Sequence, residues 1–418
     1  MNKKRFWRDN VLATAFIFAL MILISNLSAF QIFDVFDPVS EAIGDIDLTD
    51  YAFNEIRDEP VADTNIVVIN IGKLSRREIA QQLFIINRYE PAAVGMDIFF
   101  YDNKPDTLGD LLLSEALSQV DNLVMVSKLI NWNKKTDQFD SIITSLPMFL
   151  GKDGTQAISN LITEAEFQED LKAVRQFPTS REVNGVRQHA FGIELARQIN
   201  PGAVDRFLAR GNDTEYINFR GNVLDMFNKA KYKNQFFVLD VADVFTENFT
   251  ADIIKDKIVI FGYLGEDLTD PSWADKFFTP LNSKIAGRAN PDMFGVVVHA
   301  NIASMVLYEN PINNVSIVWA AIIAVILCFL NVAAFSWIYY YLPRWYDGIT
   351  KMIQLVEVLI ITVIVVIVFS AYSLRLNMTL SIFAIVLVSD SLEIYYGVVK
   401  NLFNRDERRR LFKLQKRA

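Results

Sequence analysis

Four long apolar segments constrain most strongly what this chain can fold into. Each holds about 20 predominantly apolar residues, the length that an α-helix needs to cross the hydrocarbon core of a bilayer. One segment lies near the N-terminus, and three follow one another in the last quarter of the chain. The sequence therefore predicts four transmembrane α-helices, one before and three after a large domain, at residues 11–30, 315–342, 352–374 and 378–398.

The distribution of charge predicts how these helices are oriented. Residues 31–314 carry 42 acidic and 26 basic side chains, a net charge of −16, so the rest of the chain carries 7 and 15, a net charge of +8. Basic residues collect on the cytoplasmic side of membrane spans, and here they crowd the tails at residues 1–10 and 399–418. We therefore expect both termini in the cytoplasm and residues 31–314 outside it, as one extracytoplasmic domain.

The first apolar segment also has the basic start and apolar centre of a cleaved signal peptide. Its length of about 20 residues exceeds the usual 7–15 of a signal core. The tripeptide Leu27-Ser28-Ala29 also lacks small residues at both positions that cleavage requires. These two features favour an uncleaved membrane anchor.

The domain has the alternating pattern of an α/β fold. A buried apolar run from Asn65, NIVVINIG, precedes Ser75-Arg76-Arg77-Glu78, a capping box that opens a helix reaching Tyr89. The run AAVGMDIFF completes a strand, helix and strand, which predicts a parallel pair. Further strands at NLVMVSKLI and KIVIFG predict an α/β domain with a mainly parallel central sheet. Residues 131–211 have weaker signals and either belong to that sheet or form a separate lobe.

The end of the domain leads, in sequence, almost directly into the second predicted span. The segment FGVVVHANIASMVLYEN, from Phe294 to Asn310, is too densely apolar for an ordinary strand and is typical of a mostly buried helix. The second apolar segment starts a few residues after Asn310-Pro311. A displacement of this helix could therefore be passed on to the membrane.

Several of these segments together resemble the CHASE domain of the second type, a bacterial extracytoplasmic sensory module. The resemblance rests on GMDIFF, INFRG, DKIVIFG, DLTD, FTP and GVVVHANI in this order, and it covers roughly residues 35–398. It implies a multi-pass protein of the bacterial inner membrane with its domain in the periplasm. Members of that family commonly continue into a cyclase, histidine kinase or protein kinase. This sequence has 20 residues after the last predicted span, so we expect the effector to be a separate protein.

Polar residues within these motifs are the candidate ligand or interaction residues. Asp97 follows a buried strand, and we expect it to hydrogen-bond to loop amides or to Arg220 of INFRG, because an unpaired buried carboxylate is costly. His299 and Asn301 match the His-Ala-Asn positions of the family. His299 either donates to a backbone carbonyl or contacts a ligand. Thr279 of FTP completes this set.

Three acidic residues follow the strand KIVIFG, at the sheet edge where open α/β folds bind ligands. Asp267, Asp270 and Asp275 could offer oxygen ligands to a hard cation such as Ca²⁺. Asp-rich loops, however, form turns and helix caps more often. Asp267 and Asp270 are therefore ligand or interaction candidates, and neither a metal site nor a cofactor is predicted.

Three more acidic residues lie inside the predicted spans. Glu357 is in the third span, and Asp390 and Glu393 lie three residues apart on one face of the fourth. Ionisable groups within spans cost about 3 kcal/mol each on insertion scales. These acids either reach toward the inner headgroups or pair with a basic or polar residue of another membrane subunit.

The sequence contains no Gly-rich phosphate loop, nucleophile elbow, Cys/His metal spacing or folded basic module for nucleic acid. We therefore predict a non-catalytic membrane sensor or receptor-like subunit whose outer domain binds a small molecule, an ion or a protein and relays this to a separate effector. The alternative is a structural subunit of a bacterial envelope complex. Both hypotheses predict the lipid bilayer and another membrane or envelope protein as partners, and both allow an oligomer.

Overall fold

A computed structural model gives the fold of this chain in two compact units. The sheet unit is Asp50–Ile312, and the helix unit is Met1–Thr49 together with Asn313–Ala418. The motif at Leu27-Ser28-Ala29, the end of the first predicted span and the basic tail after Lys400 lie outside the described residues. The structure describes residues 3–25, 48–133, 138–163, 173–183, 185–223, 232–271, 273–282 and 290–400.

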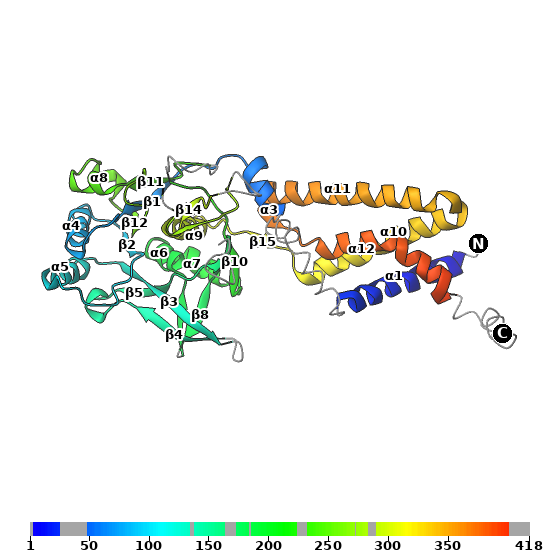
Figure 1. Ribbon diagram of the computed structural model, residues 1–418, viewed down its shortest axis with the longest axis horizontal. Coiled ribbons are helices and arrows are strands. Elements are labelled where there is room, and N and C mark those ends of the chain that lie inside the picture. Colours follow the sequence, from blue (N-terminus) through cyan, green and yellow to red (C-terminus); the bar gives the residue numbers. More distant parts are fainter. Residues whose placement is uncertain are drawn as a thin grey trace. The chain divides into compact units, whose positions relative to one another are not determined.

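A seven-stranded sheet forms the centre of the sheet unit (Figure 1). The strand order is β11-β1-β12-β2-β3-β4, and β5 also pairs with β3. Every neighbouring pair is parallel except β3 with β4, which confirms the predicted α/β fold with a mainly parallel sheet. The strands are β1 (Asp63–Asn70), β2 (Ala93–Met96), β3 (Leu123–Asn133), β4 (Gln138–Thr144), β5 (Thr155–Ile158), β11 (Phe236–Leu239) and β12 (Ile258–Gly262).

Helices cover both faces of this sheet, as continuous apolar strands require. On one face, alternate residues of β1 and β2 such as Val67 and Val94 pack in a common core with α4 (Arg76–Asn87) and α5 (Thr107–Ser118). Helix α4 begins at the predicted capping box of Ser75 and Glu78. The opposite face is covered by α6 (Phe191–Ile199) and α9 (Gly295–Leu307) (Figure 1).

Helix α9 fits tightly between α6 and the sheet because two glycines allow close approach. A Cβ atom on Gly192 of α6 would lie 2.7 Å from Ile302 Cγ2, and one on Gly262 of β12 would lie 2.5 Å from Val296 Cγ2. All residues of α9 from Gly295 to Val306 are buried. Interiors packed this closely are hard to compress, so a displacement of one element is transmitted to its neighbours.

The segment 131–211, which gave weak signals in the sequence, contributes strands to three separate sheets. Strands β4 and β5 extend the central sheet, whereas β7 contributes to a small separate sheet of order β10-β7-β6 and β8 pairs with β9 in a hairpin. The remaining elements of the sheet unit are α3 (Leu48–Tyr51), η2 (Ala52–Ile56), η3 (Pro147–Phe149), β6 (Ile162–Thr163), β7 (Val174–Pro178), β8 (Ser180–Val183), β9 (Val186–His189), α7 (Pro201–Leu208), β10 (Thr214–Tyr216), α8 (Val241–Phe245), η4 (Ala251–Ile253), β13 (Lys276–Phe277) and β14 (Met293–Phe294).

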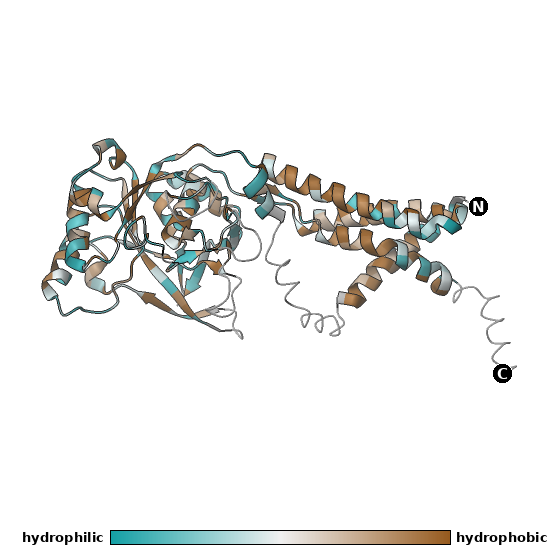
Figure 2. Ribbon diagram, turned by 45° about the horizontal axis from the view of Figure 1, so that its top comes forward, coloured by the Kyte–Doolittle hydropathy of each residue, from teal (hydrophilic) through white to brown (hydrophobic). Residues whose placement is uncertain are grey.

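The helix unit contains four described helices that are long and apolar enough to cross a membrane, one near the N-terminus and three after the sheet unit (Figure 2). Helices α1, α10 and α12 share a core that includes Ile17, Phe335 and Val388. Helix α1 starts earlier than the predicted span, and its first turns include the charged residues Lys3, Lys4, Arg5, Arg8 and Asp9. The elements are α1 (Lys3–Ser25), β15 (Asn313–Asn314), α10 (Ile317–Tyr341), η5 (Pro343–Trp345), α11 (Tyr346–Tyr372), β16 (Leu374–Arg375), α12 (Thr379–Ile394) and η6 (Tyr395–Val399).

Candidate functional site

Helix α9 runs along the strands of the central sheet, from their carboxyl ends, which we call the carboxyl edge, to their amino ends, the amino edge. Its first turn packs on Gly262, at the carboxyl end of β12. Its last turns reach Asp63, at the amino end of β1, where Ser304 Oγ donates to Asp63 Oδ2 over 2.6 Å. Because β1 and β12 are parallel, these contacts lie at opposite edges of the sheet. With 13 residues at about 1.5 Å per residue, α9 is about 20 Å long.

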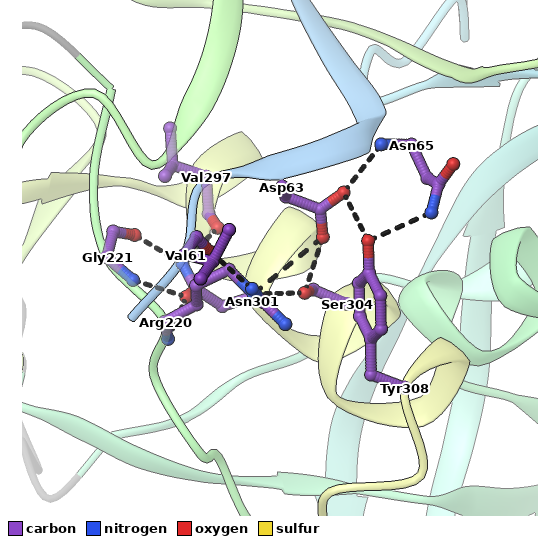
Figure 3. Close-up of polar contacts among 9 residues, drawn as sticks. All are labelled: Val61, Asp63, Asn65, Arg220, Gly221, Val297, Asn301, Ser304 and Tyr308. Carbon is purple, nitrogen blue, oxygen red and sulfur yellow. Dashed lines mark hydrogen bonds and ion pairs between the residues drawn. The ribbon is translucent and has the colours of Figure 1, made fainter. Parts of the chain in front are cut away.

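Arg220 is the centre of a polar network at the amino edge (Figure 3). Its Nε donates to Ser304 Oγ over 2.9 Å, and its Nη1 donates to the carbonyl of Val61 over 2.5 Å. The guanidinium carbon lies 4.5 Å from the ring centroid of Tyr308, which is within the range of a cation–π contact. Arg220 Nε is also 3.8 Å from Asp63 Oδ2. One cation therefore contacts both the start of the domain and the end of α9.

The carboxylate of Asp63 is buried and fully partnered. Besides the Ser304 hydroxyl, it accepts from the backbone N–H of Asn65 over 2.8 Å and from Tyr308 Oη over 3.4 Å. Tyr308 Oη in turn accepts from Asn65 Nδ2 over 2.9 Å. Burial, together with the charge of Asp63, raises the pKa of Tyr308. The phenol therefore remains a neutral donor to Asp63.

Asn301 joins α9 to the loop that carries Arg220. The side chain is completely buried. Its Oδ1 accepts from the backbone N–H groups of Arg220 and Gly221, over 2.8 and 3.2 Å. Its Nδ2 donates to the carbonyls of Gly221 and Val297, each over 2.9 Å. We call these nine residues the Arg220 network: Val61, Asp63, Asn65, Arg220, Gly221, Val297, Asn301, Ser304 and Tyr308 (Figure 3).

Neighbouring contacts extend the same connection to the last residues of the sheet unit. Asn218 accepts from Arg57 Nη1 over 2.6 Å and donates to the carbonyl of Asn310 over 2.9 Å. Arg210 Nη2 donates to the carbonyl of Ile312 over 2.9 Å. The chain at Arg57, near the start of the sheet unit, and the chain at residues 310–312, at its end, are thus both bonded to residues 210–218.

Of the two partners predicted for the Asp97 carboxylate, loop amides or Arg220, the structure excludes Arg220. Asp97 follows β2 at the carboxyl edge of the sheet, whereas Arg220 binds Asp63 at the amino edge. The backbone N–H of Asp97 donates to the carbonyl of Phe261 over 2.8 Å, but its carboxylate forms no hydrogen bond with the described residues. Burial and, to a lesser degree, the nearby charge of Asp275 raise the pKa of Asp97 to about 7. The backbone carbonyl of Asp275 accepts from the backbone N–H of Gly295, so Asp275 and the nearby Asp97 lie close to the start of α9.

The raised pKa of Asp97 predicts that the protein loses stability as pH rises from about 4 to about 7. The folded state binds a proton in this range that the unfolded state, with a pKa of 3.8, has already released. Asp97→Asn should therefore stabilise the protein by about 2 kcal/mol at pH 8, since the side chain keeps some exposure, and have no such effect at pH 4. Native-state hydrogen exchange at both pH values measures this. An equal effect at the two pH values would contradict the assignment.

The other predicted residues at the carboxyl edge have local partners. Asp267 Oδ1 accepts from the backbone N–H of Thr269 over 2.7 Å, and Asp270 Oδ2 accepts from that of Glu266 over 2.8 Å, so both stabilise turns. Thr279 is buried and bonds to the carboxylate of Asp292 through its N–H and its hydroxyl. Among the described residues, no group of three or more acidic, histidine or cysteine side chains could hold a metal ion.

His299 packs edge-to-face on Phe191 of α6, with the ring centroids 5.4 Å apart. Its Nδ1 is buried and has no hydrogen-bond partner within the ranges that the structure describes, and burial lowers the pKa of the imidazole to about 4. His299 is therefore neutral at physiological pH. The hydrogen bond expected between His299 and a backbone carbonyl is absent among the described residues.

The acidic residues of the predicted spans occupy three different environments. Asp390 of α12 pairs with Lys351 of α11, with distances of 2.7 and 2.8 Å from Lys351 Nζ to its two oxygens. Glu357 is partly buried in α11 beside Asn331 of α10, and its Oε2 has no hydrogen-bond partner in the described part of the chain. Glu393 is exposed on α12. Asp390 thus has a partner within its own chain, and pairing of these acids with another subunit stays a prediction.

The sequence analysis found Arg220 and Asn301, which the structure brings together, but it missed Asp63, Ser304 and Tyr308. A signal for two of them was present. Asn301, Ser304 and Tyr308 are spaced by three and four residues, so they share one face at the end of an otherwise apolar helix. Asp63 gave no comparable signal, because ten acidic residues lie in that part of the chain, between positions 34 and 63.

An α/β domain in sequence between one apolar helix and three others defines a membrane protein with a single large folded domain. A family model described as CHASE2 domain matches residues 18–335. This match covers about three quarters of the chain, and the chain therefore belongs to the CHASE2 domain family, whose members are extracytoplasmic sensory domains of the second CHASE type. The matched range ends in α10, earlier than the resemblance seen in the sequence. No curated protein and no solved structure matches the chain.

Proposed function

We propose that this protein is a non-catalytic sensor of a bacterial inner membrane, with the sheet unit in the periplasm and both termini in the cytoplasm. Membership of a sensory family and four candidate membrane spans support the class. The basic residues that flank the spans support the orientation. Another membrane or envelope protein is the effector that receives the signal.

The observation that carries this proposal is the Arg220 network. It bonds the first residues of β1 to the last turns of α9, after which the chain continues through Ile312 to α10. A small molecule, ion or protein that binds near Asp97 and Asp275 would act on the first turn of α9. Because α9 is rigid and closely packed, a shift of its first turn moves its last turn as well. Through the network, this shift changes the position of the segment after α9 relative to the segment before β1.

The single cysteine of the chain offers a direct test of this relay. Cys328 is buried in α10, inside a candidate membrane span. Arg220→Lys keeps the charge beside Asp63 but lacks the planar fork that reaches both Val61 and Ser304. The full chain in lipid nanodiscs is treated with N-ethylmaleimide, and modification of Cys328 is followed by mass spectrometry. We expect Arg220→Lys to change the rate about fivefold, the lower end of typical coupling between sites.

The matched control is Arg77→Lys, because Arg77 forms an exposed ion pair with Asp106 on the opposite face of the sheet. This variant should react at the rate of the unaltered protein. Equal rates for the unaltered protein, Arg220→Lys and Arg77→Lys would mean that the sheet unit does not influence the spans.

A second candidate function is that of a structural subunit in an envelope complex. One observation favours it: α5 and the segment before it expose Tyr101, Leu108 and Leu111, whose side chains are 64%, 52% and 62% exposed. Neighbouring exposed apolar residues on a folded domain are typical of protein-binding surfaces. In this case the domain would dock another envelope protein, and Arg220→Lys would leave Cys328 unaffected.

A further inference from the structure

The helix unit contains an ion pair that joins the first helix to the end of the last one. Lys400 directly follows η6, and its Nζ donates to Asp9 Oδ2 of α1 over 2.7 Å and to Tyr340 Oη of α10 over 2.9 Å. The same Nζ lies 4.7 Å from the ring centroid of Tyr396. The side chain of Asp9 is only 10% exposed. We call Asp9, Tyr340, Tyr396 and Lys400 the Lys400 clasp.

The clasp continues into the core of the helix unit through Tyr396. Its hydroxyl donates to Ser336 Oγ of α10 over 2.9 Å, and its ring stacks on Tyr339 with the centroids 5.0 Å apart. Tyr339 in turn meets the ring of Tyr346, at the start of α11, edge-to-face. A movement of Lys400 would therefore disturb contacts on α1, α10 and α11 together.

Two features of the clasp indicate that this arrangement can open. Asn10, next to Asp9, is completely buried, yet neither its amide nitrogen nor its amide oxygen has a hydrogen-bond partner among the described residues. A buried amide without partners destabilises the conformation that contains it. In addition, η6 is a π-helix with Gly397 at its centre. π-Helical turns are less regular than α-helical ones and occur frequently at functional sites.

We propose that the Lys400 clasp is the output switch of the helix unit: when the sensory domain changes state, Asp9 and Lys400 separate, and the end of the last span is released. This inference rests on the proposed relay and adds the place where the signal leaves the membrane. Lys400 directly precedes the basic segment 401–418 in the sequence. Helix α1 precedes the sheet unit in the chain, so a change in the sheet unit can reach it. The π-helix η6 ends the last span, and the clasp joins these two elements.

Hydrogen exchange of residues 395–400 in the full chain, in lipid nanodiscs, tests the switch. Asp9→Asn keeps the size of the side chain but removes its charge, so we expect these amides to exchange about tenfold faster, as for the loss of a charge-assisted hydrogen bond. The exchanged pair, Asp9→Lys with Lys400→Asp, should restore slow exchange. Arg344→Gln, an exposed basic residue of η5, is the matched control and should have no effect.

The same measurement on Arg220→Lys separates the clasp from the relay. Faster exchange at residues 395–400 together with an altered Cys328 rate supports both proposals. An altered Cys328 rate with unchanged exchange keeps the relay and overturns the clasp as its output. Unchanged values in both measurements overturn both proposals. Unaltered exchange in Asp9→Asn, or failure of the exchanged pair to restore it, also overturns the clasp.

Discussion

Replacing Arg220 with leucine is expected to lower the free energy of unfolding of the sheet unit by about 3–5 kcal/mol. The cause is Asp63, whose side chain is completely buried and would lose its nearby cation. The Ser304 and Tyr308 hydroxyls would remain, but they cannot neutralise the carboxylate. Native-state hydrogen exchange of β1 and β12 in the full chain measures the loss, because these buried strands exchange only through global opening of the unit.

The control for this prediction is Arg77→Leu. Arg77 and Asp106 form an ion pair whose side chains are 44% and 46% exposed. Solvent screens such a pair, and its loss costs less than about 1 kcal/mol. A similar loss in the two variants would mean that Asp63 gains no more from Arg220 than a surface acid gains from its partner.

The general fold could be predicted because its main strands and helices have local signals. Strand β12 is a continuous apolar run, and α4 begins at a capping box formed by residues three apart. The four apolar helices follow from length and composition alone. These signals need no knowledge of distant contacts, which is why the sequence indicates a mainly parallel sheet and four spans.

The candidate site could be predicted only in part because its contacts are non-local. Ser304 and Asp63 are 241 residues apart, and Arg220 and Ser304 are 84 apart. The assignment of Asp97 to Arg220 failed because a residue after a parallel strand lies at the carboxyl edge, whereas Arg220 turned out to lie at the amino edge. The edge at which a loop residue lies depends on the path of the whole loop between two strands. INFRG has no strand pattern that would indicate this path.

The same reason explains the missed clasp in the helix unit. Asp9 lies in residues 1–10, which the sequence analysis predicted as a cytoplasmic tail from their basic side chains. In the structure the carboxylate of Asp9 pairs with Lys400, which is 391 positions away in the sequence. This pairing offsets the free-energy cost of burying the carboxylate. Charged residues at the ends of apolar segments are therefore poor markers of helix boundaries when a distant partner of opposite charge exists.

Replacing Asn301 with alanine is expected to destabilise the sheet unit by about 3–5 kcal/mol as well, although no charge is lost. The variant leaves the backbone N–H groups of Arg220 and Gly221 and the carbonyl of Gly221 without the partner that Asn301 provides. Each unsatisfied buried polar group costs about 1–3 kcal/mol.

The control is Asn103→Ala, in an exposed loop, which should change the stability by less than about 0.5 kcal/mol. Asn301→Asp is informative too, because a carboxylate still accepts from both N–H groups but cannot donate to Gly221. Its loss should be at least as large as that of Asn301→Ala, because the buried carboxylate would face the carbonyl oxygens of Gly221 and Val297 without a proton to donate. Asn301 bonds only the backbone N–H of Arg220, but both side chains hold the same loop to α9. The double variant Asn301→Ala with Arg220→Leu should therefore lose less than the sum of the two single losses. Strict additivity, measured by the same hydrogen exchange of β1 and β12, would mean that the two residues stabilise α9 independently and do not form one network.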